Sequence, residues 1–325
     1  MKRTAKWSVL ALAVTFALIL GLQSPANAQE KEIRFGYLVA DQLHSPAVMI
    51  MKEKKMLEAA GFKVAWREFL AGSYLMQDFA SGQIDFGSLG AVPVLITRGQ
   101  GVDVVILASA NAEGSSIVVK DSIKTAKDLN GKSLGTPGIG SIQDALVDMV
   151  ARKENIKILH KHMKVSDMPL FLKKGEIDGF IAWAPHPARA VDLGYGHELF
   201  TSHDLLPDHQ CCVVVTKGAM LKNDPETVKK VMNVYLRACE WYQANRDEAI
   251  AMMVQKTGMK EEVIREALKT VKNPFPPYCN VPSLKFQAEG LVEGGKIQKD
   301  VITNMDDFIK QTYHPEILET ALEKK

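Results

Sequence analysis

The sequence predicts an α/β protein built from two similar lobes with a cleft between them. Residues 82–93 read GQIDFGSLGAVP, and residues 175–187 read GEIDGFIAWAPHP. Each copy has a Gly suited to end a helix, an apolar run typical of a buried parallel strand, and a proline suited to the first turn of the next helix. Ligands bind beyond the carboxyl ends of strands in open α/β sheets. We therefore expect the loops after the two apolar runs to face each other across the cleft.

The first 28 residues have the pattern of a secretory signal. Lys2, Arg3 and Lys6 precede an apolar run at residues 9–22, and Ala-Asn-Ala at 26–28 fits a cleavage site. The run is shorter than the ~20 residues that a membrane-spanning helix needs. We expect residues 1–28 to be a signal peptide that is removed, so that a soluble mature chain begins near Gln29.

Charge and cysteine content exclude other classes of protein. The expected mature chain has 37 Lys and Arg against 38 Asp and Glu and no dense basic block, so nucleic acid is not an expected partner. No C-x-x-C pair indicates a redox motif or a structural zinc site. We expect four small buried thiols, whereas a Cys239–Cys279 disulfide stays open and a vicinal bridge would be strained. The cysteines are Cys211, Cys212, Cys239 and Cys279.

The first lobe is expected to alternate strands and helices. Strands are predicted at residues 32–39, 63–69, 84–89 and 102–108, and helices at 47–60, from 72 to about 82, and up to 98. Ser45 and Pro46 suit the N-cap and first position of one helix, and Gly72 with Ser73 opens the next. A strand at 117–119 follows the first crossing between lobes.

The second lobe repeats this alternation and a helical tail follows it. Strands are predicted at residues 132–135, 160–165 and 177–182, and helices at 141–153, 168–174 and up to about 193. Ser141 and Asp144 are expected to form a capping box. A strand at 211–216 returns to the first lobe, and helices follow at 225–246, 246–257, 260–271, 306–312 and 315–323.

Two crossovers, near residues 111–116 and 208–211, make a hinge suited to closure around a ligand. The predicted domains are residues 29–113 with 211–325 for the first lobe and its tail, and residues 114–210 for the second lobe.

Loops that end in helix N-termini on the cleft side are the candidate binding elements. Free N–H groups and the helix dipole attract anions and carbonyl oxygens there. Ser73 and Ser141 are also expected to cap their own helices. Trp183 would supply an apolar face or an indole donor. The candidates from this reasoning are His44, Ser45, Gly72, Ser73, Asn111, Gly140, Ser141, Trp183, His186 and His209.

Signatures of enzymes and metal sites are missing from the sequence. It contains no G-x-S-x-G, no G-x-x-x-x-G-K-[ST] and no H-E-x-x-H. Asp85 and Asp178, equivalent in the two repeats, are expected to be turn or cap residues away from the cleft. We expect no metal and no catalytic residue, while metal ligation shared by His44, His186 and His209 stays open.

Several segments between residues 32 and 260 together carry a family resemblance. They are IRFGYL, Ser45-Pro46, Gly72-Ser73, GQIDFGSLGAVP, DLNGKSLGTPGIGSIQD, GEIDGFIAWAP and the helical tail. In this order they resemble the nitrate/sulfonate/taurine (NitT/TauT-like) family of ABC-transporter substrate-binding proteins. The resemblance implies a two-lobed type II periplasmic binding protein fold with two crossovers and a C-terminal helical tail. It also implies a monomeric periplasmic protein without cofactor that delivers a small solute to an ABC permease with a cytoplasmic ATPase.

The family's pocket loops correspond to residues 44–46, 72–73, 90–93, 140–143 and 183–186, which adds Gly90, Ala91, Ile142 and Gln143 to the candidates. Ala91 stands where relatives often have an acidic or polar residue. These loops contain no Arg or Lys, so a sulfonate or nitrate would depend on helix N-termini and hydroxyl groups. A secreted enzyme related to thiamine-pyrimidine or menaquinone biosynthesis proteins is the alternative. The secretory signal argues against it, and a sensor module ranks third.

Overall fold

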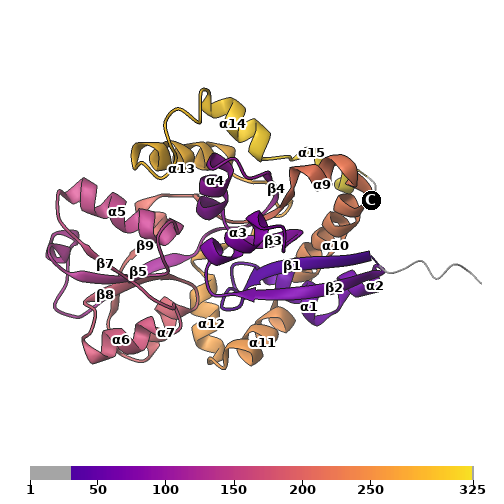
Figure 1. The fold of residues 1–325 in the computed structure, drawn as a ribbon. Coiled ribbons are helices and arrows are strands. Elements are labelled where there is room, and N and C mark those ends of the chain that lie inside the picture. Colours follow the sequence, from indigo (N-terminus) through magenta and orange to yellow (C-terminus); the bar gives the residue numbers. More distant parts are fainter. Residues whose placement is uncertain (1–30, 324–325) are drawn as a thin grey trace, which may run out of the picture. The chain divides into compact units, whose positions relative to one another are not determined.

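Two mixed sheets organise the chain (Figure 1), of which the computed structural model describes residues 31–323. The six-stranded sheet has the order β11-β4-β10-β3-β1-β2, and the five-stranded sheet has the order β7-β6-β8-β5-β9. The strands are β1 (Lys31–Leu38), β2 (Phe62–Phe69), β3 (Phe86–Gly90), β4 (Val104–Glu113), β5 (Ser115–Val119), β6 (Ser133–Thr136), β7 (Leu159–His162), β8 (Gly179–Trp183), β9 (His197–Thr201), β10 (Gln210–Lys217) and β11 (Val271–Lys272).

Helices fill most connections between strands and form the C-terminal region. Their bounds are α1 (Pro46–Glu53), α2 (Met56–Ala59), α3 (Gly72–Ala80), α4 (Ala91–Gly99), η1 (Ala126–Leu129), α5 (Ile142–Glu154), α6 (Met168–Lys174), α7 (His186–Asp192), α8 (Ser202–Leu205), α9 (Gly218–Asn223), α10 (Pro225–Ala244), α11 (Arg246–Thr257), α12 (Glu261–Leu268), α13 (Val281–Glu293), α14 (Met305–Thr312) and α15 (Glu316–Leu322). Within residues 31–323, none of them combines the length and apolar character that crossing a bilayer requires. The expected signal peptide lies outside the described residues.

The repeat in the sequence is also a repeat in the structure. The Asp85 N–H donates to the Arg34 carbonyl oxygen at 2.9 Å, and its carboxylate accepts the Arg34 N–H at 3.0 Å. Asp178 makes the same two backbone contacts with Ser133, both at 2.9 Å. Each aspartate therefore anchors the start of its strand to a neighbouring strand. Neither lines the pocket described below, which agrees with their predicted position away from the cleft.

Both faces of the six-stranded sheet are buried. Phe86 and Leu107 pack in one apolar cluster, with residues of α1 and α10. Leu89 and Ile106 pack in another cluster, which continues into the five-stranded sheet. Alternate residues of one strand thus enter different clusters, as the pleat requires. Glu32–Lys325 accordingly form one compact unit.

The chain passes between the sheets twice, close to the predicted crossovers. Strand β4 ends at Glu113 and β5 begins at Ser115 in the other sheet, so that Gly114 alone links them. Gly114 has a φ of +91°, a conformation that glycine adopts without steric cost. The chain returns between α8 and β10. The exact domain boundaries stay a prediction.

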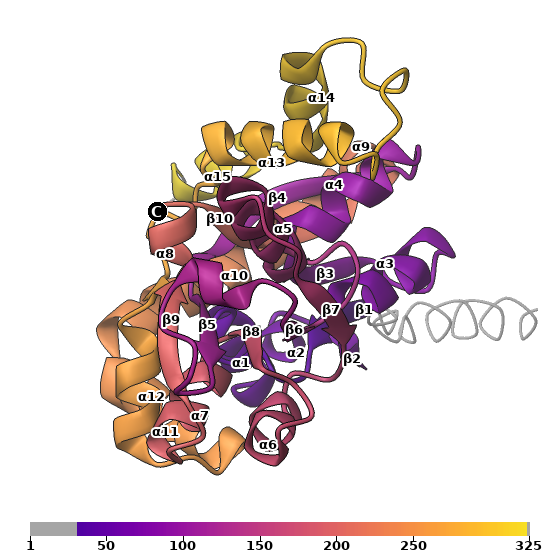
Figure 2. The ribbon, with the colours of Figure 1, turned by 90° about the vertical axis from the view of Figure 1, so that its left-hand side faces the viewer.

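The C-terminal helices contact both halves of the protein, whereas the sequence suggested helices that wrap the first lobe. Helix α10 packs on α1, and Figure 2 shows α13 alongside α4. Helix α12, however, packs on α7, which follows a strand of the five-stranded sheet. Helix α13 and strand β9 were not among the predicted elements.

Two capping predictions need correction. Ser141 caps α5 as expected, accepting the Asp144 N–H at 3.1 Å. The predicted capping box is wrong, because the Asp144 carboxylate accepts hydrogen bonds from Thr136 and His160 instead. Ser73 does not cap α3, because the helix already begins at Gly72 and its N-cap is Ala71.

Candidate functional site

A pocket of about 30 Å³ lies between loops of the two sheets. The six-stranded sheet and its helices contribute Leu38, Asp41, His44, Ala71, Gly72, Ser73, Gly90, Pro93, Cys211 and Cys212. The five-stranded sheet contributes residues 137–143 and Trp183. Both sheets therefore provide walls at the carboxyl ends of their parallel strands, where the sequence predicted the cleft.

Helix N-termini from both sheets meet at this pocket. Gly72 and Ser73 are the first residues of α3, Gly90 is the N-cap of α4, and Ser141 is the N-cap of α5. The first N–H groups of a helix lack intrahelical partners and lie at the positive end of its dipole. Among the residues that the structure describes, no Lys or Arg lines the pocket. Backbone dipoles at these helix ends are therefore one source of positive potential in the walls.

Trp183 closes one side of the pocket. It is the last residue of β8 and only 5% of its surface is exposed. Its indole N–H donates to the Ala40 carbonyl oxygen at 2.9 Å, and Ala40 follows β1 of the other sheet. The His186 ring stands edge-on to the indole, with 6.5 Å between ring centroids. Trp183 thus forms a wall and also joins the two sheets.

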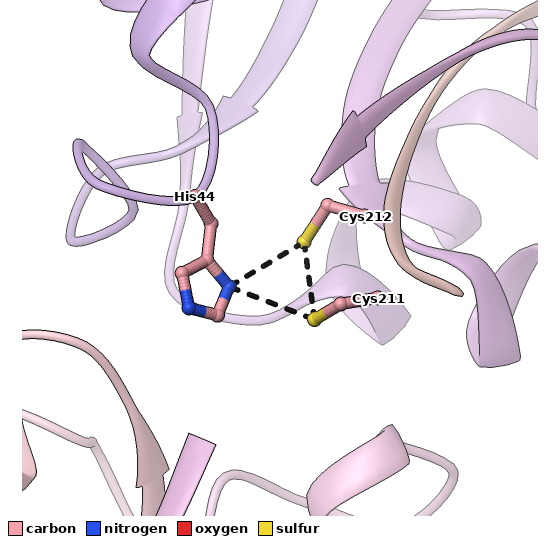
Figure 3. Close-up of side chains that lie close together, drawn as sticks. All are labelled: His44, Cys211 and Cys212. Atoms are coloured by element: carbon pink, nitrogen blue, oxygen red, sulfur yellow. Dashed lines mark hydrogen bonds between the residues drawn. The ribbon is translucent and has the colours of Figure 1, made fainter. Parts of the chain in front are cut away.

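His44, Cys211 and Cys212 lie together at the base of the pocket, and their side chains point toward one another (Figure 3). The His44 Nδ1 atom is 3.6 Å from Cys211 Sγ and 4.0 Å from Cys212 Sγ, and the two sulfur atoms are 3.8 Å apart. Asp41 lies beside them, with Oδ1 3.7 Å from His44 Nδ1 and Oδ2 3.8 Å from Cys212 Sγ. All four side chains are buried.

A β-bulge brings the two thiols to the same side of β10. Successive side chains of a regular strand point to opposite faces. Here Gln210 pairs with Ala112 but Cys212 pairs with Asn111, so Cys211 is an extra residue in the ladder. The Asn111 side chain supports the bulge by accepting the Cys212 N–H at 3.0 Å. Bulges commonly re-aim a side chain in this way next to functional sites.

Burial and mutual contacts shift the pKa values of these groups. Burial raises the pKa of Asp41 to about 7, since its charged form loses hydration. Burial alone would lower the pKa of His44, but the neighbouring Cys211 and Asp41 raise it to about 9. A hydrogen bond from Cys212, reinforced by the His44 charge, holds the pKa of Cys211 well below its ordinary value. The base of the pocket is therefore a coupled polar cluster inside an apolar surrounding.

Comparison with known proteins identifies the family. A profile of the NMT1-like family matches residues 26–256, more than two thirds of the chain. The chain belongs to that family. The taurine-binding periplasmic protein of Escherichia coli is 29% identical to this NMT1-like protein, over 66% of this chain and 71% of the relative.

Solved structures share the fold of this NMT1-like protein. The periplasmic aliphatic sulphonate binding protein SsuA from Escherichia coli has a TM-score of 0.70 at 21% identity, covering 87% of this chain and 97% of that one. The periplasmic nitrate-binding protein NrtA from Synechocystis has a TM-score of 0.77 at 15% identity, covering 91% and 89%. The predicted family resemblance and the α/β, two-lobed type II fold are confirmed.

The structure of the NMT1-like protein brings nine predicted site residues to the pocket lining. They are His44, Gly72, Ser73, Gly90, Gly140, Ser141, Ile142, Gln143 and Trp183. Ser45, Ala91, Asn111, His186 and His209 are buried nearby but do not line the pocket. Their contact with a ligand, like that of the other nine, stays a prediction.

Asp41 and the two cysteines are lining residues that the sequence reasoning missed. Cys211 and Cys212 were interpreted as small buried apolar side chains, and they are buried. Their place directly after the predicted return crossover was the available signal, because residues at that crossover were already candidates for the cleft.

Proposed function

We propose that this protein is the periplasmic solute-binding subunit of an ABC importer and is not an enzyme. It captures a small anionic or polar organic solute, such as a sulfonate or nitrate, and delivers it to a permease with a cytoplasmic ATPase. The observation that carries the proposal is the pocket whose walls come from loops of both sheets. The names of its relatives, which include taurine-, sulphonate- and nitrate-binding proteins, support the solute class.

The N-termini of α3, α4 and α5 would supply N–H donors to the anionic end of the solute. The hydroxyl of Ser73 and the amide of Gln143 would add side-chain donors, and the Ser141 hydroxyl would do so once it releases the Gly138 carbonyl oxygen. Trp183 would cover the apolar part of the solute. The five candidates outside the lining would act by supporting these loops.

We further propose that residues 29–113 with 211–325, and residues 114–210, form two lobes that close about the crossovers. Closure would bury the solute between the sheets. The mature monomer would start near Gln29 after export to the periplasm. N-terminal sequencing of the protein recovered from a periplasmic extract should find Gln29 or a neighbouring residue. A cytoplasmic product that keeps Met1 would contradict the localisation.

A thermal-shift screen tests the function directly. Taurine, longer alkanesulfonates, nitrate, small carboxylates and thiamine-pyrimidine precursors are added singly to the purified mature protein. A ligand at 100 times its Kd adds about 2.7 kcal/mol to the free energy of unfolding, which raises the melting temperature. We expect at least one sulfonate or nitrate to do so. If none shifts the melting temperature, or if the protein turns over a precursor, the importer assignment fails.

A further inference from the structure

The base of the pocket contains metal-binding donor atoms whose presence is not explained by binding of a polar organic solute. The cluster consists of an imidazole nitrogen and two thiols, buried together. We propose that His44, Cys211 and Cys212 bind a thiophilic cation with a filled d shell, Zn²⁺ or Cu⁺, at the base of the pocket. Two thiols and one imidazole are the donor types that these cations prefer, and the protons that these groups carry are released on binding.

The spacing of the three donor atoms agrees with coordination to one ion. Zinc lies about 2.3 Å from thiolate sulfur and about 2.0–2.1 Å from imidazole nitrogen, so tetrahedral ligands are separated by about 3.8 Å for two sulfurs and about 3.6 Å for sulfur and nitrogen. The observed separations are 3.8 Å between Cys211 and Cys212, and 3.6 Å and 4.0 Å from His44 Nδ1 to the two sulfurs. Two of the three separations equal the required distances, and the distance from His44 Nδ1 to Cys212 Sγ exceeds its required value by about 0.4 Å.

The hydrogen bonds of His44 orient its free nitrogen toward the thiols. Its Nε2 atom lies 2.9 Å from the carbonyl oxygen of Gly114. A carbonyl can only accept, so Nε2 carries a proton, and Nδ1, which faces the two thiols, is the nitrogen that would give up its proton to an ion. This arrangement, with the second nitrogen held by a carbonyl oxygen, is the usual support for a metal-binding histidine. Asp41, near His44 and Cys212, would hold the outer side of the site.

The backbone at β10 is shaped to present both thiols. Without the bulge at Cys211, the two side chains would point to opposite faces of the sheet. The buried side chain of His209 also lies next to the bulge in sequence. His209 donates from Nδ1 to the Leu206 carbonyl oxygen at 2.8 Å, yet its buried Nε2 has no hydrogen-bond partner among the described residues. His209 is thus a neighbour of the bulge in sequence, but the three grouped ligands are His44, Cys211 and Cys212.

An ion with three protein ligands keeps a coordination position for a fourth, and His44, Cys211 and Cys212 all line the pocket. The two thiolates offset the charge of a Zn²⁺ ion, so the ion would hold a solute by direct coordination at its open position and not by net charge. If the proposed function holds, the ion would anchor the anionic group of the solute by accepting it as the fourth ligand. The pocket volume of about 30 Å³ is enough for an ion and about one water-sized ligand.

The test measures metal binding by the reduced, mature protein without organic solute, under argon. Zn²⁺ is titrated by calorimetry, Cu⁺ by competition with a chromogenic chelator, and Co²⁺ by the thiolate-to-cobalt charge-transfer absorption. We expect one ion per chain and the charge-transfer band. Cys211→Ser, Cys212→Ser and His44→Gln should each weaken binding more than the 10–100-fold that loss of an outer-shell partner costs.

Controls separate loss of the site from loss of the fold. Cys279→Ser, a change at another buried cysteine outside the cluster, should bind the ion as the wild type does. Cys211→Ala keeps the site apolar, and circular dichroism should show it folded while the cobalt band disappears. The site is refuted if the wild type binds no ion at micromolar concentration, or if the cysteine variants bind equally well. A Cys211–Cys212 disulfide that persists in the reduced preparation refutes it too.

The anchoring role has its own readout. Solute affinity is compared for metal-loaded protein and protein treated with a chelator. A Kd at least tenfold lower for the loaded protein supports the role, and equal affinities contradict it. Failure of every solute with normal metal binding would instead refute the proposed transport function, so that the two proposals fail in different ways.

Discussion

Trp183 donates its indole N–H to the carbonyl oxygen of Ala40 at 2.9 Å, and this bond joins the five-stranded sheet to the loop after β1 of the six-stranded sheet. The same side chain lines the pocket. A solute seated against Trp183 would therefore contact the residue that holds the two sheets together. If the two lobes close around a solute as proposed, binding and closure would be linked through this indole.

Replacing Trp183 by Phe should separate its two roles. The phenyl ring would keep an apolar wall but lose the hydrogen bond to Ala40, lowering the free energy of unfolding by about 1 kcal/mol. Trp183→Ala should in addition lower solute affinity by on the order of 1–3 kcal/mol, because the wall is removed. Urea unfolding and calorimetry with the solute found in the screen measure the two effects.

Trp66→Phe is the matched control. Trp66 lies on β2, and its indole N–H donates to Glu58 at 3.2 Å, away from the pocket. The Trp66→Phe variant should have a lower free energy of unfolding than the wild type but the same affinity for the solute. If Trp183→Ala binds the solute as tightly as the wild type, the pocket is not the binding site.

Ser141→Ala should lower both stability and affinity. The Ser141 hydroxyl accepts the Asp144 N–H and donates to the Gly138 carbonyl oxygen, which holds the glycine loop over the pocket. Loss of the cap should cost about 1 kcal/mol of unfolding free energy. Asn304→Ala removes the comparable cap of α14, which lies outside the pocket. Only Ser141→Ala should weaken solute binding, and an equal affinity in the two variants would remove Ser141 from the site.

The parts of the fold that depend on local pattern could be predicted from the sequence. The apolar runs after Gly82 and Gly175 are strands β3 and β8, and both glycines have the positive φ expected just after a helix. Helix α13 was missed although Asn280 caps it and its buried residues recur at helical spacing, because Gly290 interrupts the pattern. Strand β9 is short and depends on pairing with β5, which no local pattern reveals.

The candidate site divides in the same way. Loops that open helices could be located from Gly and Ser alone, and they reach the pocket. The cluster of His44 with Cys211 and Cys212 could not be located from the sequence, because it requires a bulge whose position depends on pairing between β10 and β4. Residues 44 and 211 meet only once the chain has crossed between the sheets twice.

Gly114→Ala should be strongly destabilising. A methyl group at this position would collide with His44 Nε2, and the φ of +91° is unfavourable for alanine. Gly194→Ala is the control, because Gly194 has a φ of +67° and open space around it. Backbone strain should cost each variant on the order of 1–3 kcal/mol, and overpacking should add about 1–3 kcal/mol at Gly114 only. If urea unfolding shows the same loss of unfolding free energy for Gly114→Ala and Gly194→Ala, the tight contact between Gly114 and His44 is contradicted.

Glu113 makes the stability of the crossovers pH-dependent. Its buried carboxylate accepts hydrogen bonds from His203 at 2.6 Å, from the Asp208 N–H at 2.6 Å and from Lys272 at 3.1 Å. Burial raises the pKa of Glu113, but these three donors outweigh burial and hold the pKa below its ordinary value of 4.5. Because the pKa of Glu113 is lower in the folded state, its ionised carboxylate stabilises the fold. This stabilisation is complete above about pH 4.5 and is lost as the pH falls through the folded pKa.

Lys272 also pairs with Asp208 at 2.7 Å, so one ammonium group connects the two crossovers. Lys272→Met should lower the free energy of unfolding by about 1 kcal/mol at pH 7. The difference from the wild type should be smaller at pH 3 than at pH 7, because the pKa values of Glu113 and Asp208 lie below their ordinary values and the carboxylates lose their charge as the pH falls through them. Lys269→Met, which breaks an exposed pair with Glu266, should change stability by less than about 0.5 kcal/mol at either pH. Urea unfolding of the three proteins at both pH values decides the matter, since an equal loss at pH 7 and pH 3 would show that Lys272 acts through packing and not through its charge.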